Sequence, residues 1–191
     1  MVGNCRLLLG PMFSKKTRRL CEELGTLTDV GMKCILINHI DHARETTYGD
    51  KWISTHNSHY TPLSKSITVT LSSSLSGVNV DDYDIIGVDE GQFFNDLEET
   101  VRDWVFNHNK IVIIASLDGD FNLRPFGQVH NLESICEQNN VVRLTAFCQP
   151  CLGQKKLVNA SFSKRLGSGT AQKDVGGKDK YIPVCLSCYH D

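Results

Sequence analysis

The stretch RLLLGPMFSKKT, residues 6–17, decides the fold that we expect for this 191-residue chain. Its apolar run stops abruptly at Gly10, a polar loop follows, and Leu20, Leu24 and Leu27 then recur at near-helical spacing. The order is therefore strand, loop, helix. In that context GPMFSKKT matches the phosphate-binding pattern G-x-x-x-x-G-K-[ST] at seven of its eight positions.

The loop has the groups that hold a triphosphate: backbone N–H donors at a helix N-terminus, a lysine and a hydroxyl. Lys16 takes the place of the lysine that reaches the β- and γ-phosphates, and Thr17 that of the hydroxyl on Mg²⁺. Lys15 stands where the pattern has its second glycine, and at positive φ a non-glycine residue costs about 1–2 kcal/mol. An ordinary strand-to-helix turn is the alternative. The predicted ATP-binding residues of the loop are Gly10, Pro11, Met12, Phe13, Ser14, Lys15, Lys16 and Thr17.

Three further buried strands are predicted by continuous apolar runs at 33–37, 85–88 and 111–115. Strands that are apolar on both faces belong in a parallel sheet covered by helices. An apolar stripe at helical spacing over residues 97–105 predicts one such helix, and residues 141–146 resemble one more strand. We therefore predict an α/β fold with a P-loop-type, mostly parallel sheet flanked by helices over residues 1–144.

Two adjacent acids, Asp89 and Glu90, follow the apolar run at 85–88. Ligands of open α/β sheets bind at the carboxyl ends of the strands, and a carboxylate there can hold Mg²⁺. Successive strand residues point to opposite faces, so the two acids are expected to do different tasks. For transfer to a hydroxyl group the second task is that of general base. Taken alone, the pair is also typical of a solvated turn.

Four of the eight cysteines form two C-x-x-C pairs, Cys148 with Cys151 and Cys185 with Cys188. This arrangement suits a tetrahedral structural Zn²⁺ site. The long spacer between the pairs is no objection, because each doubling of a loop adds only about 0.6 kcal/mol of closure entropy. A redox pair or two disulfides are the alternatives. We predict a small zinc-binding lobe over residues 145–191 that carries a flexible substrate loop. The other cysteines, Cys5, Cys21, Cys34 and Cys136, are expected in the core.

Charge and hydropathy exclude several classes of function. The formal net charge of −2 gives no general attraction to nucleic acid or anionic membrane. The longest apolar run falls far short of the roughly 18 residues typical of a membrane span, and the N-terminus lacks the pattern of a secretory signal. We therefore expect a cytoplasmic protein with neither nucleic acid nor membrane as its partner.

The phosphate loop, the acidic strand end and the cysteine pairs together resemble the zinc-containing thymidine kinase family, the type found in animals, many bacteria and large DNA viruses. The resemblance extends over nearly the whole chain. Its most specific motifs are LGPMFS at 9–14, DEGQFF at 89–94, LDGDF at 117–121, RPFG at 124–127, KRLG at 164–167 and GGKDKY at 176–181.

The resemblance implies roles for the residues at matching positions. Glu90 corresponds to the base that takes the proton from the nucleoside 5′-hydroxyl, and Asp89 to the acid on the Mg²⁺ side. Asp89, Gln92 and Arg44 join the predicted ATP-binding set. Thymidine is expected to contact Met12, Phe93, Leu117, Phe121, Phe126, Ser163 and Tyr181, and a lid loop that contains Gln172, Lys173, Asp174, Val175 and Gly176.

The chain also departs from the family pattern. Besides Lys15, the acid of the family's D-x-R motif is displaced to Asp41 or absent, whereas Arg44 keeps its place. The implied activity is thymidine phosphorylation by ATP with Mg²⁺ and a structural Zn²⁺, in a homotetramer that dTTP inhibits. A degenerate member that binds nucleoside or nucleotide with little turnover, because of Lys15, is one alternative. A zinc-ribbon nucleic-acid-binding ATPase is another.

Overall fold

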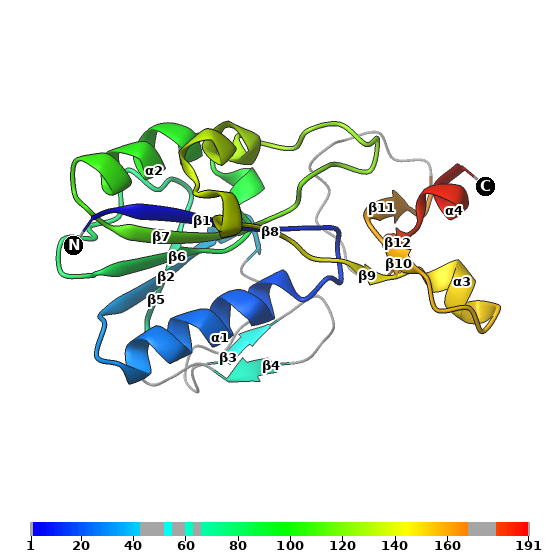
Figure 1. The fold of residues 1–191 in the computed structure, drawn as a ribbon, viewed down its shortest axis with the longest axis horizontal. Coiled ribbons are helices and arrows are strands. Elements are labelled where there is room, and N and C mark those ends of the chain that lie inside the picture. Colours follow the sequence, from blue (N-terminus) through cyan, green and yellow to red (C-terminus); the bar gives the residue numbers. More distant parts are fainter. Residues whose placement is uncertain (1, 43–51, 55–59, 63–65, 168–178, 191) are drawn as a thin grey trace.

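The architecture is an α/β sheet with helices on both faces (Figure 1), described in a computed structural model for residues 2–42, 52–54, 60–62, 66–167 and 179–190. Six strands form the main sheet in the order β5-β2-β6-β7-β1-β8, and each pairing in it is parallel. The predicted fold class is confirmed. The strands are β1 (Asn4–Leu9), β2 (Cys34–His39), β5 (Thr68–Ser72), β6 (Ile85–Val88), β7 (Ile111–Ser116) and β8 (Val141–Arg143).

Helices cover the two faces of this sheet. α1 (Lys16–Asp29) packs on one face, and α2 (Leu97–Phe106) lies on the other, next to the 3₁₀ helix η4 (Val129–Ile135) (Figure 1). Because side chains alternate along a strand, Leu7 and Leu9 enter the core under α2 while Leu8 enters the core under α1. All three are fully buried. The apolar run before Gly10 is therefore the centre of both cores.

The structure alters one sequence expectation for the sheet and adds an edge strand that the sequence did not predict. The single strand expected at 141–146 is wrong, because β8 ends at Arg143 and β9 (Ala146–Phe147) pairs with β10 (Asn159–Ala160) in a separate sheet. Strand β5 has no continuous apolar run, since it lies at the sheet edge and alternates Thr-Val-Thr-Leu. Between β2 and β5, two short strands, β3 (Trp52–Ser54) and β4 (Tyr60–Pro62), pair antiparallel.

The C-terminal part of the chain forms a small lobe with two two-stranded sheets. β9 pairs with β10, and β11 (Phe162–Arg165) pairs with β12 (Tyr181–Val184), all antiparallel. Two short helices complete it, α3 (Gln149–Gly153) and α4 (Leu186–His190). The lobe lies at the end of the sheet where the β1–α1 loop turns (Figure 1). The domain boundary at residue 144 stays a prediction.

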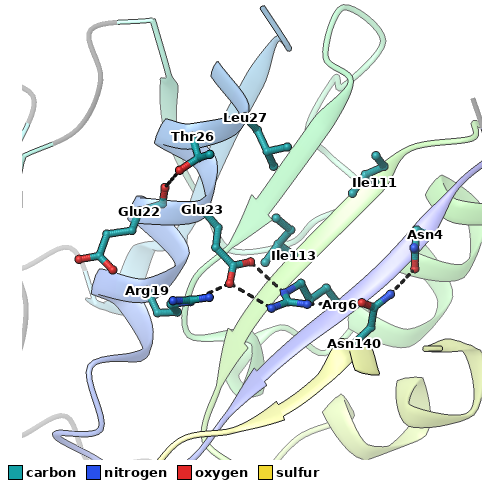
Figure 2. A pocket seen from close by; sticks show the side chains of 10 residues that line it. All are labelled: Asn4, Arg6, Arg19, Glu22, Glu23, Thr26, Leu27, Ile111, Ile113 and Asn140. Carbon is teal, nitrogen blue, oxygen red and sulfur yellow. Dashed lines mark hydrogen bonds and ion pairs between the residues drawn. The ribbon is translucent and has the colours of Figure 1, made fainter. Parts of the chain in front are cut away.

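A hollow of about 460 Å³ lies between α1 and the first residues of β1 and β7, away from the β1–α1 loop (Figure 2). Its floor is apolar, with Ile111 and Ile113 from β7, and its rim carries Arg6, Arg19 and Glu23.

No helix among the described residues is long and apolar enough to span a bilayer. Three 3₁₀ segments complete the description: η1 (Ile40–His42), η3 (Gly91–Phe93) and η5 (Gln138–Asn140).

Candidate active site

The carboxyl ends of three adjacent strands bring the candidate site together. β6, β7 and β1 are neighbours in the sheet, and each is followed at this edge by a segment that the sequence singles out. Gly10 follows β1, Asp89 follows β6 and Leu117 follows β7. Parallel strands end at the same edge, so segments far apart in the sequence meet there.

The phosphate loop is held in shape by left-handed residues and internal hydrogen bonds. Phe13 and Lys15 have φ values of 66° and 65°, in the left-handed region. Because Lys15 has a positive φ, its left-handed backbone costs about 1–2 kcal/mol relative to glycine. The Ser14 hydroxyl donates to the Pro11 carbonyl at 2.8 Å. Gly10 has φ 151°, and a Cβ there would lie 2.3 Å from the Leu144 carbonyl oxygen, so a side chain does not fit.

Lys16 and its carboxylate neighbours set the charge of the site. Its ammonium donates to the Pro11 carbonyl at 2.8 Å, so in this structure it lies over its own loop. Burial lowers the pKa of Lys16, and the negative charges of three nearby carboxylates oppose that shift. These carboxylates belong to Glu90, Asp89 and Asp118. Among the described residues, the Lys16 ammonium thus lies near three carboxyl groups, an arrangement that suits a site for a further cation.

Asp89 and Thr17, the two predicted Mg²⁺ ligands, contact each other. The Thr17 hydroxyl donates to Asp89 Oδ1 at 3.1 Å, although 72 positions separate the two residues. Burial and the adjacent Glu90 charge raise the pKa of the Asp89 carboxyl to about 7, although the Thr17 hydrogen bond and the Lys16 charge act to lower it. A buried carboxylate beside a hydroxyl is a donor set that Mg²⁺ accepts. The pair fits the role that the resemblance implies.

Glu90 leaves the chain in a different direction from Asp89. β6 ends at Val88, and Glu90 has φ 55° and ψ 42°, a left-handed conformation that is uncommon outside glycine. Its carboxylate accepts a 2.6 Å hydrogen bond from Gln92 Nε2. Asp89 bonds to Thr17 and Glu90 bonds to Gln92, so the two neighbouring acids have different partners. This difference is consistent with the expectation that they have different tasks.

The residues expected to contact thymidine come together largely in pairs. The Met12 backbone N–H donates to the Ser163 hydroxyl at 2.9 Å, which joins the phosphate loop to β11 of the lobe. Other pairs are aromatic: the ring centroids of Phe93 and Phe126 are 5.5 Å apart, and those of Phe121 and Tyr181 are 6.5 Å apart. Leu117 is half-buried at the end of β7.

Some of the predicted residues cannot be placed. Arg44 and the lid residues Gln172, Lys173, Asp174, Val175 and Gly176 lie outside the described residues. Their roles stay predictions.

The four paired cysteines form one cluster in the lobe. Their sulfurs all lie within 4.8 Å of one another, with Cys151 Sγ 3.6 Å from Cys188 Sγ and 4.0 Å from Cys185 Sγ. A tetrahedral Zn²⁺ with bonds of about 2.3 Å separates its sulfurs by about 3.8 Å, so the cluster fits this ion. Burial acts to raise the pKa of Cys148, but hydrogen bonds to its sulfur outweigh burial and lower the pKa to about 7. The structure thus holds one four-sulfur site.

Sequence reasoning missed several residues that shape the site. The Asp120 carboxylate accepts the backbone N–H groups of Asn122 at 2.8 Å and Arg124 at 2.9 Å, which fixes the turn that carries Phe121. The Tyr189 hydroxyl on α4 donates to the Phe121 carbonyl at 2.7 Å, so the lobe also holds that turn. Asp118, near Lys16, had a readable signal, since an acid that follows an apolar strand lies at the carboxyl edge.

The fold and these residues define a P-loop-type α/β protein with an added four-cysteine lobe. The family model described as thymidine kinase matches residues 3–189 of the chain. A thymidine kinase of Raccoon poxvirus is 39% identical over 187 residues, covering 98% of this chain and 97% of the relative. Those of Monkeypox virus and Vaccinia virus (strain Western Reserve) are 36% and 35% identical over 189 residues, each covering 99% of this chain and 98% of the relative. The chain belongs to the thymidine kinase family.

Proposed function

We propose that the chain transfers the γ-phosphoryl group of ATP to the 5′-hydroxyl of thymidine. One observation carries the proposal: at the carboxyl edge of the sheet, Glu90 is held by Gln92 while its neighbour Asp89 is bonded to Thr17 of the phosphate loop. This separation provides one carboxylate for the metal nucleotide and one for the acceptor hydroxyl. Near full-length similarity to proteins named thymidine kinase supports the same activity.

The phosphate loop acts by positioning and neutralising charge, which is most of what phosphoryl transfer demands. Its backbone N–H groups bind phosphate oxygens, and Lys16 leaves the Pro11 carbonyl to pair with the β- and γ-phosphates. Thr17 and Asp89 would hold Mg²⁺, which when bound neutralises negative charge on the nucleotide. Arg44 remains in the proposed ATP-binding set through the family resemblance, which also implies a nucleotide-binding role for Gln92.

Glu90 takes the proton of the thymidine 5′-hydroxyl while the oxygen of that hydroxyl attacks the γ-phosphorus of ATP and ADP leaves. A positioned general base is typically worth about 10²–10⁴-fold in rate. The left-handed backbone of Glu90 is a strained conformation of the kind that clusters at active sites.

Thymidine binds in an apolar slot between the phosphate loop and the lobe. Phe121 and Tyr181 supply aromatic surface, and Arg165 stacks over both rings, with its guanidinium carbon 5.1 Å and 5.9 Å from their centroids. Met12, Phe93, Leu117, Phe126 and Ser163 complete the described part of the slot. The lid residues Gln172 to Gly176 close it in this proposal. A small flat base suits such a pocket.

The Lys15 substitution does not favour the degenerate alternative. The loop forms with Lys15 in the left-handed conformation and its side chain exposed. The nucleic-acid alternative has little support either, since the net charge of −2 offers no basic footprint.

The family resemblance completes the proposal. We propose a cytoplasmic homotetramer inhibited by dTTP, with the nucleotide-binding domain at residues 1–144 and the zinc lobe at 145–191. The small molecules thymidine and ATP are its partners, and nucleic acid and membrane are not.

The direct test is a phosphorylation assay of the purified, metallated protein with ATP, Mg²⁺ and each deoxynucleoside. We expect thymidine to be phosphorylated. Glu90→Gln is expected to lose nearly all turnover while binding thymidine and ATP, whereas Glu99→Gln on the exposed side of α2 leaves turnover unchanged. A fully active Glu90→Gln variant would show that the base is another group.

A further inference from the structure

Gln92 has both ends of its side-chain amide engaged. It is 3% exposed. Its Nε2 donates to Glu90 Oε2 at 2.6 Å, and its Oε1 accepts from the Leu117 backbone N–H at 3.0 Å. The Ser116 hydroxyl lies 2.9 Å from the same Oε1 and 3.0 Å from the Leu117 carbonyl, and its single proton can be donated to either. The amide therefore bridges from the end of β7 to the carboxylate of Glu90.

The direction of this amide is determined by its partners. An amide oxygen and nitrogen are hard to tell apart by shape, and their assignment depends on the surrounding hydrogen bonds. The Leu117 backbone N–H can only donate, so it requires Oε1 on its side. The NH₂ group then faces Glu90, which as a carboxylate can only accept. The Nε2 end of the amide consequently faces the Glu90 carboxyl group, and its Oε1 end faces the end of β7.

The backbone of Gln92 is held as firmly as its side chain. Gly127 packs against it with φ 68°, and a Cβ on Gly127 would lie 2.5 Å from the Gln92 carbonyl oxygen. Ser116, at the β7 end of the bridge, has no exposed surface. Glu90, by contrast, sits on a strained left-handed residue just after the end of β6. The Gln92 amide thus ties the carboxylate of Glu90 to the buried end of β7.

We propose that Gln92 is a positioning residue that holds Glu90 in the orientation needed for proton removal, and that Ser116 and the Leu117 N–H orient Gln92. This inference rests on the proposed function, in which Glu90 is the base. It differs from the nucleotide-binding role that the family resemblance implies for Gln92, because it predicts an effect on turnover and none on ATP binding.

The test begins with Gln92→Met, which keeps the length of the side chain and removes the amide. With thymidine and ATP both saturating, we expect kcat to fall about 10- to 100-fold, the size expected for a misplaced catalytic group. The KM values for thymidine and ATP are expected to stay within about twofold of wild type, since uniform binding is unchanged. Gln138→Met, at an exposed glutamine of η5, is the matched control and is expected to behave as wild type.

A double-mutant cycle separates positioning from a general structural effect. If Gln92 acts through Glu90, Gln92→Met has no further effect on kcat in a Glu90→Gln background, because groups that act as a unit are not additive. Multiplying effects would overturn the proposal. Ser116→Ala, which leaves Gln92 in place, is expected to lower kcat less than Gln92→Met and provides the test if Gln92→Met does not fold.

The remaining outcomes are distinct. A raised KM for ATP at unchanged kcat would assign Gln92 to the nucleotide and overturn the positioning role. Full activity of both Gln92→Met and Ser116→Ala would also overturn it while leaving the proposed function intact. A wild-type protein without thymidine phosphorylation would instead refute the proposed function, and with it the inference.

Discussion

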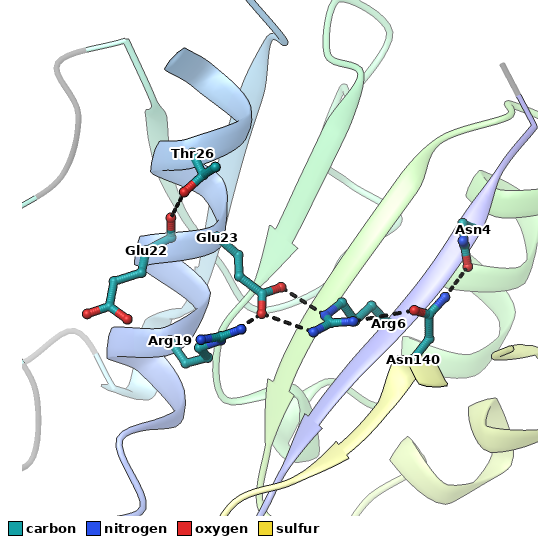
Figure 3. Close-up of polar contacts among 7 residues, drawn as sticks. All are labelled: Asn4, Arg6, Arg19, Glu22, Glu23, Thr26 and Asn140. Carbon is teal, nitrogen blue, oxygen red and sulfur yellow. Dashed lines mark hydrogen bonds and ion pairs between the residues drawn. The ribbon is translucent and has the colours of Figure 1, made fainter. Parts of the chain in front are cut away.

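Two polar clusters lie at opposite ends of the strands, and they differ in the balance of positively and negatively charged side chains. Near the beginning of β1, Glu23 of α1 lies between two cations: Arg6 Nε is 2.9 Å from Oε2, and Arg19 Nε is 2.8 Å from Oε1 (Figure 3). Asn140 accepts from Arg6 at 3.4 Å and donates to Asn4 at 2.9 Å, which extends the network to η5. Each carboxylate oxygen of Glu23 thus has a cationic partner.

At the carboxyl edge the balance is reversed. Lys16 lies near the carboxyl groups of Asp89, Glu90 and Asp118, and its ammonium donates to the Pro11 carbonyl. The pKa of the Asp89 carboxyl rises to about 7 because of burial and the Glu90 charge. Like charges gathered in a buried place mark a site arranged for a ligand, whereas matched charges mark a structural contact. Variants at the two ends should therefore separate activity from stability.

The largest effect is expected at Asp89. Asp89→Asn removes the predicted metal carboxylate and one of two repelling negative charges. We expect kcat/KM to fall by about 10³-fold or more, equivalent to about 4 kcal/mol of transition-state stabilisation. The free energy of unfolding without nucleotide is expected to stay equal or rise, as measured by urea denaturation. A large loss of unfolding free energy in Asp89→Asn would contradict the view that the carboxyl-edge cluster is arranged for a ligand and not for stability.

Removal of the lobe metal is expected to have the next largest effect. A strong chelator should free the four thiols, and Cys185→Ser should leave only three of them to hold the metal. Either change should loosen α4, from which Tyr189 holds the Phe121 carbonyl. We expect the KM for thymidine to rise about tenfold or more, by weakening the slot that holds the base. The KM for ATP should change less. Metal analysis should give one Zn²⁺ per chain, and Cys21→Ser, outside the cluster, should leave that ratio unchanged.

Glu23→Gln tests the matched cluster. Glu23 is 16% exposed and Arg6 is 28% exposed, so the substitution leaves a partly buried guanidinium without its anion. We expect a loss of about 1–2 kcal/mol of unfolding free energy, between the values for exposed and buried ion pairs. Activity at saturating substrates should stay at wild-type levels. Glu22→Gln, which loses only an exposed ion pair with Arg18, is the control.

The smallest effect is expected from Lys15→Gly. Glycine relieves the left-handed strain but adds entropy to the unfolded chain, so the net gain in stability is about 0.5–1 kcal/mol. We expect kcat to change by less than about threefold, because the loop already has the conformation that glycine would adopt. Steady-state assays check this. A rise of orders of magnitude would revive the degenerate alternative.

Much of the fold could be predicted because its signals are local. The buried strands at 33–37, 85–88 and 111–115 are continuous apolar runs, and the helix over 97–105 is a regular stripe. The end of the strand near Leu144 has no local signal in the sequence. The Leu144 N–H still donates to the Leu9 carbonyl of β1, but β9, which follows, pairs with β10 in another sheet. Strand β5 was missed because an edge strand needs only partial burial and lacks an apolar run.

The sequence by itself determined which chemical groups are present and in what order: the phosphate loop, the acid pair, the cysteine spacing and the family motifs. Only the tertiary structure decided which of them meet. The Thr17 hydroxyl bonds to Asp89, and the Met12 N–H bonds to Ser163. The Gln92 amide donates to Glu90 and also contacts Ser116, which is 24 residues farther along the chain at the end of β7. These contacts depend on hydrogen bonds between separate segments of the chain, and their direction depends on which partner can donate, which no local pattern encodes.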